Sequence, residues 1–235
     1  MPSASAAPVT WLASYPRSGN TLLRIILKRC FGQASQSIYA DAEFSAPEVA
    51  TLVGHEQVGD NPADFIARAR QAGRGLYVKT HELPPNDRHP SIYVVRDGRS
   101  AVVSHAHYLR QILGLDMTLG EVIRGKAGHS WSAHVRAWMM RPGTLLVRYE
   151  DLAAGNVATL NSIAQFIGKP QLRAFDISFA ALHAANGSFF RKGSDRANIL
   201  EMGPEYELLF EQLHGAVLRD LGYGGVSDGE ICASA

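Results

Sequence analysis

The 235-residue chain is 46% hydrophobic and 19% charged, as in ordinary globular proteins, and we expect one domain over residues 1–235. Its 23 Lys and Arg residues balance 22 Asp and Glu residues, and a formal charge of +1 argues against a global field that attracts nucleic acid or an anionic membrane. The two cysteines, Cys30 and Cys232, are far apart in sequence, which argues against a disulfide framework or a zinc site. The sequence shows neither a leader pattern nor an apolar run of about 18 residues, so we expect a soluble, cytoplasmic protein.

Short apolar runs alternate with helical periodicities along the chain. In chain order, the patterns predict a strand at 9–14, helices at 18–31, 47–53 and 62–72, strands at 75–80 and 91–96, helices at 98–112, 118–125 and 130–140, a strand at 144–149, and helices at 156–167, 174–184 and 204–221. This alternation predicts an α/β fold in which helices cover both faces of a parallel sheet. Ligands of such sheets bind beyond the carboxyl ends of the strands, where Tyr15, His81 and Arg96 lie.

The turn after the first strand has the sequence YPRSGNT, residues 15–21. Ser18 is a candidate N-cap of the next helix, and Gly19 allows close approach of the backbone to a ligand. The expected anion donors are the backbone N–H groups of Gly19, Asn20 and Thr21. Compared with the triphosphate loop G-x-x-x-x-G-K-[ST], the first Gly is Ser14 and the Lys is Asn20. On this segment alone, a turn that binds nothing is an equal alternative.

Lys79, Thr80 and His81 close the strand at 75–80. A histidine at a strand end can serve as a general base, and a lysine two residues earlier points to the same side. Because the chain has nine histidines, a purely structural role for His81 is the open alternative.

Arg96 ends the strand at 91–96, and Ser104 follows eight residues later within a helix. Both side chains can face one phosphate if the chain bends between strand and helix. The alternative is that Arg96 and Asp97 form a pair of charged residues on the surface. The stretch FFRKG adds Arg191 and Lys192, which alone indicate only solvated cations.

These segments resemble the motifs of sulfotransferases that use 3′-phosphoadenosine 5′-phosphosulfate (PAPS). YPRSG is similar to the family's 5′-phosphosulfate loop, Tyr-Pro-Lys-Ser-Gly, with Arg17 in place of Lys. The Lys-Thr-His order at 79–81 matches the cytosolic branch, in which the histidine deprotonates the acceptor hydroxyl and the lysine contacts the sulfuryl group. Arg96 and Ser104 match the spacing of the 3′-phosphate motif.

Weaker matches follow toward the C-terminus. Arg191, Lys192 and Gly193 match an Arg-Lys-Gly segment that closes over the 3′-phosphate, although SDRANI replaces the usual continuation. Tyr149 and the pair Ser178-Phe179 stand where the family contacts the adenine, with core packing as the alternative.

Four motifs thus occur in the family's order. The resemblance implies a three-layer α/β fold related to P-loop kinases, and transfer of a sulfuryl group from PAPS to a hydroxyl of a small-molecule acceptor, with 3′-phosphoadenosine 5′-phosphate (PAP) as product and no metal required. It implies His81 as base, with Lys79 and Arg17 stabilising charge on the sulfuryl group. The implied donor-binding residues are Arg17, Ser18, Gly19, Asn20, Thr21, Arg96, Ser104, Tyr149, Phe179, Arg191, Lys192 and Gly193.

Two other functions stay open. A P-loop small-molecule kinase predicts magnesium dependence and ATP binding, but the loop lysine that it needs is missing. A non-catalytic nucleotide-binding module explains the phosphate contacts but gives no reason for Lys79 and His81 at a strand end. The acceptor and the oligomeric state cannot be read from the sequence.

Overall fold

The computed structural model describes residues 9–39, 47–56, 75–176 and 195–224. The chain folds into two compact units. We call them the sheet unit, Met1–Arg96 with Ala137–Ser194, and the helical unit, Asp97–Arg136 with Asp195–Ala235.

The sheet unit contains a five-stranded, fully parallel sheet in the order β2-β3-β1-β4-β5. The strands are β1 (Val9–Ser14), β2 (Gln36–Ser37), β3 (Leu76–Thr80), β4 (Ser91–Val95) and β5 (Thr144–Arg148). The predicted α/β fold is confirmed, and each predicted strand lies within one residue of the observed one. Among the strands in the described residues, β2 alone was missed, because its two polar residues carry no apolar pattern.

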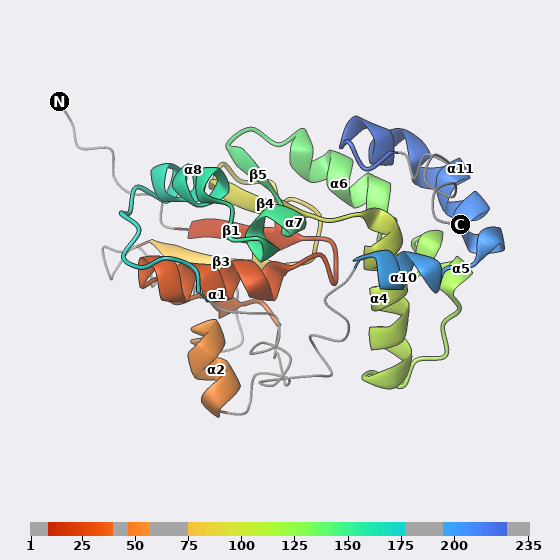
Figure 1. Cartoon of the computed structure of the whole chain (residues 1–235), viewed down its shortest axis with the longest axis horizontal. Helices are drawn as coiled ribbons and strands as arrows, with labels where there is room; N and C mark the ends of the chain where they lie inside the picture. Colours follow the sequence, from red (N-terminus) through yellow and green to blue (C-terminus); the bar gives the residue numbers. More distant parts are fainter. Residues whose placement is uncertain (1–8, 40–46, 57–74, 177–194, 225–235) are drawn as a thin grey trace, which may run out of the picture. The chain divides into compact units, whose positions relative to one another are not determined.

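Helices α1 (Asn20–Phe31), α7 (Tyr149–Ala153) and α8 (Val157–Ile167) share one core with the sheet, and α1 and α8 lie on the same face in Figure 1. This core includes the apolar side of α1 and buried residues of four strands. On the other face, Tyr93 of β4 stacks on Trp138 of α6 (Trp131–Met139), with ring centroids 6.0 Å apart. The sheet unit also contains α2 (Pro47–Val53).

The helical unit is formed by α4 (Gly98–Gln111), α5 (Leu119–Ile123), α10 (Asp195–Leu200), α11 (Pro204–Asp220) and the first part of α6. At its centre the Trp131 ring lies 5.7 Å from the Phe210 ring. His214 is buried between the hydroxyl of Ser132, 2.7 Å from its Nδ1, and the carbonyl of Ile123, 2.9 Å from its Nε2. Burial lowers the pKa of His214, which favours the neutral imidazole that satisfies both contacts.

Some boundaries differ from the predicted ones. The predicted helix at 62–72 lies outside the described residues, and the described part of the one at 174–184, residues 174–176, is not helical. The strand predicted at 144–149 ends at Arg148, and α7 begins at Tyr149, with acidic residues in its first turn that suit the helix dipole. No described helix has the length and apolar character needed to cross a membrane.

Candidate functional site

Parallel pairing brings several predicted residues to one edge of the sheet. Ala13 of β1 pairs with Thr80 of β3, and Val95 of β4 pairs with Arg148 of β5. The residues that follow these strand ends therefore gather at the carboxyl edge, where parallel sheets bind ligands.

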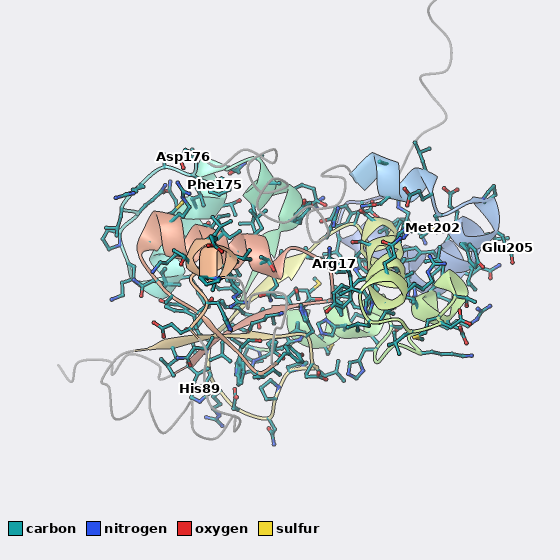
Figure 2. All side chains as sticks on the ribbon, turned by 90° about the horizontal axis from the view of Figure 1, so that it is seen from below. Arg17, His89, Phe175, Asp176, Met202 and Glu205 are labelled. Atoms are coloured by element: carbon teal, nitrogen blue, oxygen red, sulfur yellow. The ribbon has the colours of Figure 1, made fainter. Side chains whose placement is uncertain are left out.

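The turn between β1 and α1 is shaped by its backbone, and Figure 2 labels Arg17 there. Gly19 is the N-cap at φ 105°, and no side chain caps the helix. The expectation that Ser18 caps α1 is therefore wrong, because its own N–H folds back onto the Tyr15 carbonyl at 3.1 Å and places the residue before the helix start. The Ser18 Oγ is buried and has no hydrogen-bond partner among the described residues. The first N–H groups of α1, which lack partners within the helix, open onto this turn.

Arg17, in this turn, has a left-handed backbone conformation. Its φ of 64° makes it the one residue other than glycine in the left-handed region among those that the structure describes. Such a conformation costs on the order of 1–3 kcal/mol unless its surroundings hold it. Arg96 Nη1 donates to the Arg17 carbonyl at 3.0 Å, so the end of β4 supports the strained turn.

Asn20 stands where a triphosphate loop has its lysine. Its Nδ2 donates to the Leu12 carbonyl at 2.8 Å and lies 3.5 Å from the Ser14 Oγ. The side chain thus ties α1 to β1. The predicted role of Asn20 in anion binding involves its backbone N–H and stays a prediction.

Tyr149 packs on the same turn. The Arg96 guanidinium lies 4.3 Å from the centroid of its ring, within cation–π range. A Cβ atom on Gly19 would lie 2.5 Å from the Tyr149 Cδ2. Gly19, Arg96 and Tyr149 therefore form one packed group, and the predicted contact of Tyr149 with adenine stays a prediction.

Replacing Gly19 with alanine should destabilise the fold by more than backbone strain alone. A left-handed backbone costs an L residue about 1–2 kcal/mol, and here the new methyl group also overlaps the Tyr149 ring. Gly168→Ala is the matched control, because Gly168 has φ 64° but no atom within 4 Å of the added Cβ. Urea denaturation should show the larger loss for Gly19→Ala, and equal losses would contradict the packing described for Tyr149.

His81 follows β3, and its ring is fixed by the end of β1. Its Nδ1 lies 2.8 Å from the Ser14 carbonyl oxygen and 3.3 Å from the Ser14 Oγ. A carbonyl only accepts, so we assign the proton to Nδ1, which donates to it. The lone pair of the neutral ring is then on Nε2, the state that a general base requires.

Tyr39 is a neighbour of His81 that the sequence did not indicate. The two rings stack with centroids 5.8 Å apart and an interplanar angle of 24°, and the backbone N–H of His81 donates to the Tyr39 hydroxyl at 2.9 Å. Lys79 is buried, with its Nζ 5.4 Å from the centroid of the same Tyr39 ring. Lys79 of β3 and His81, which follows the strand, therefore share one aromatic neighbour.

The structure brings two of the predicted residues, Asn20 and His81, together at Ser14. Its hydroxyl lies near Asn20 of the turn and its carbonyl accepts from His81. Ser104 lies on α4 of the helical unit, where it is buried. Phe179, Arg191, Lys192 and Gly193 lie outside the described residues. Within the described ranges no three His, Cys, Asp or Glu side chains are grouped to hold a metal ion.

Comparisons with known proteins show the family and the fold. A family model described as "Sulfotransferase domain" matches residues 7–221. The chain is 26% identical over 182 residues to flavonol 3-sulfotransferase of Flaveria bidentis, covering 68% of the chain and 56% of that protein. It is 30% identical over 185 residues to a WSCD family member of Aedes aegypti, covering 72% of the chain and 53% of that protein. The chain therefore spans about half the length of these curated relatives.

Among solved structures, the mouse sulfotransferase SULT7A1 complexed with PAP is similar, with a TM-score of 0.66 and 20% sequence identity. The similarity covers 92% of the chain and 86% of that structure, and it shows a shared fold.

Proposed function

The chain belongs to the sulfotransferase domain family, and we propose that it transfers the sulfuryl group of PAPS to a hydroxyl of a small-molecule acceptor. The observation that carries the proposal is the pairing of His81 Nδ1 with the Ser14 carbonyl at 2.8 Å, at the same sheet edge as the turn before α1. With the proton on Nδ1, Nε2 is the nitrogen that can accept a proton, and we propose that the turn at this edge of the sheet holds the anionic donor. The similar mouse structure contains PAP, which supports the choice of donor.

The residues of the turn suit the 5′ end of PAPS. A buried hydroxyl without a partner is destabilising by about 1–3 kcal/mol, and an anionic oxygen would satisfy the Ser18 Oγ. The N–H groups that begin α1 are further donors, and Arg17 adds a positive charge. A transferring sulfuryl group carries less negative charge than a γ-phosphoryl group, so backbone donors and one or two cations suffice.

In this mechanism, PAPS supplies an activated sulfuryl group with PAP as its leaving group. His81 takes the proton of the acceptor hydroxyl on Nε2 while the Ser14 carbonyl holds Nδ1–H. Lys79 and Arg17 stabilise the negative charge that develops during transfer. The residues that we assign to the 3′-phosphate are Arg96, Ser104, Arg191 and Lys192, together with Gly193, which follows Lys192 in the sequence. Those that we assign to adenine are Tyr149 and Phe179.

We also place the protein in the cytoplasm. Cys30 is a free, buried thiol, which suits a reducing compartment. The formal charge of +1 gives no reason to expect nucleic acid or a membrane as partner.

Calorimetry distinguishes this proposal from the two others. We expect PAP to bind with the same affinity in EDTA and in magnesium, because backbone N–H groups and cationic side chains supply all the contacts. ATP should bind more weakly than PAP, with or without magnesium, since it lacks a 3′-phosphate. Magnesium-dependent ATP binding that exceeds PAP binding would support the kinase function. Metal-independent PAP binding without transfer to any acceptor would support the non-catalytic module.

A further inference from the structure

Strand register places Tyr39 beside His81. Ser37 of β2 pairs in parallel with Lys79 of β3, so the residues two positions later on each chain segment are also neighbours. The Ile38 N–H extends this pairing by donating to the Lys79 carbonyl at 3.4 Å. Short as it is, β2 brings an aromatic ring to the carboxyl edge of the sheet.

Tyr39 contacts its surroundings with both its hydroxyl and its ring. The hydroxyl accepts a hydrogen bond from the backbone N–H of His81 at 2.9 Å and donates one to Glu82 Oε1 at 3.0 Å. The ring stacks on the His81 imidazole, and the Lys79 ammonium lies 5.4 Å from its centroid. Burial raises the pKa of Tyr39, so the phenol keeps the proton that it donates to Glu82.

We propose that Tyr39 is a positioning residue, which holds the imidazole of His81 and the ammonium of Lys79 in the geometry needed for transfer. The inference rests on the proposed function, because it assigns Tyr39 a role through those two residues. The Ser14 carbonyl holds one edge of the imidazole, and the stacked phenol ring restricts the tilt of its plane. The same ring attracts the ammonium of Lys79 through its π-face.

The two parts of Tyr39 can be removed separately. Tyr39→Leu removes the ring, and a displacement of a catalytic group by about 1 Å lowers turnover on the order of 100-fold. Tyr39→Phe keeps the ring and loses the hydrogen bonds that the hydroxyl makes with the His81 backbone N–H and with Glu82, each worth about 1 kcal/mol, so the rate should fall by roughly 30-fold at most. We therefore expect kcat to fall in the order wild type, Tyr39→Phe, Tyr39→Leu. The Km for PAPS and the affinity for PAP should stay unchanged, a separation that general destabilisation would not produce.

Kinetics with PAPS and p-nitrophenol test this order, with Tyr206→Leu in α11 as the matched control, expected to keep wild-type kcat. Adding Tyr39→Leu to a His81→Ala variant should lower kcat by much less than it does in the wild type, because most of its effect acts through His81. Full kcat in Tyr39→Leu, or an undiminished effect in the His81→Ala background, would overturn the inference.

A readout independent of activity separates this inference from the proposed function. In the proton NMR spectrum of the full chain, the His81 ring protons should carry a ring-current shift that Tyr39→Phe keeps and Tyr39→Leu removes. If the wild type transfers sulfate to no acceptor, the proposed function fails, and with it the role of Tyr39 in transfer. If His81 shifts are the same in all three proteins, the ring does not hold the imidazole and the positioning role is wrong, whatever the activity.

Discussion

Replacing His81 with alanine is expected to lower kcat by about 10²–10⁴-fold and to leave the affinity for PAP close to that of the wild type. The Ser14 carbonyl accepts a hydrogen bond from Nδ1 of His81, which leaves Nε2 to take up the proton of the acceptor. The substitution removes this nitrogen. Asn20 and Arg96 hold the turn before α1, so we expect the turn to keep its shape without the imidazole. Steady-state kinetics and PAP calorimetry on the same preparation check both halves of the prediction.

Two further variants make this result specific. His81→Gln keeps a polar side chain of similar reach but cannot take up a proton at neutral pH, so it should lose as much turnover as His81→Ala. His89→Ala should behave as the wild type, since His89 precedes β4 and lies at the opposite end of the sheet from Arg17 in Figure 2. A His81→Gln enzyme with full turnover, or a loss of PAP affinity as large as the loss of turnover, would show that His81 is not the base.

Replacing Arg96 with alanine is expected to have the opposite effect, on donor binding first. A charge-assisted hydrogen bond to phosphate contributes on the order of 1.5–3 kcal/mol, which weakens PAP binding roughly 10- to 100-fold when it is lost. Arg96 is 7% exposed and is held in place by the Tyr149 ring and the Arg17 carbonyl. Because these contacts fix the guanidinium before the donor binds, little rotamer freedom is lost on binding.

Adenosine 5′-phosphate separates the two roles that Arg96 can have. It lacks the 3′-phosphate, so its affinity should change much less than that of PAP in Arg96→Ala, and Arg96→Lys should recover part of the PAP affinity. Arg88→Ala, which removes an exposed cation from the loop before β4, is the matched control and should bind PAP normally. Equal losses for both nucleotides would mean that Arg96 acts only by supporting the turn at Arg17.

Much of the sheet and its binding edge could be predicted because both follow from local patterns. Buried parallel strands appear in the sequence as continuous apolar runs. Because the strands are parallel, residues that follow them lie at the carboxyl edge of the sheet, and Lys79, His81 and Arg96 stand at or just after strand ends. The two-residue strand β2 has no such pattern, so Tyr39 could not be placed beside His81 from the sequence.

The turn before α1 could be located but not described in detail. The assignment of Ser18 as N-cap followed residue preference, whereas the φ of 105° at Gly19 moved the cap by one residue. The role of Asn20 as a tie to β1 depends on a contact across the turn, with a residue eight positions away, and that of Arg96 as a support for Arg17 depends on a contact across 79 positions. Such contacts are set by tertiary packing.

The central claim is tested most directly by incubating the purified chain with PAPS in EDTA and a panel of hydroxylated acceptors, including phenols, sterols and sugars. Mass spectrometry should detect a sulfated acceptor that forms one for one with PAP, and its formation should depend on His81. Transfer of one SO₃ group to a nucleophilic oxygen adds about 80 mass units to the acceptor. If PAP binds but no acceptor gains this mass, the chain is not the enzyme proposed.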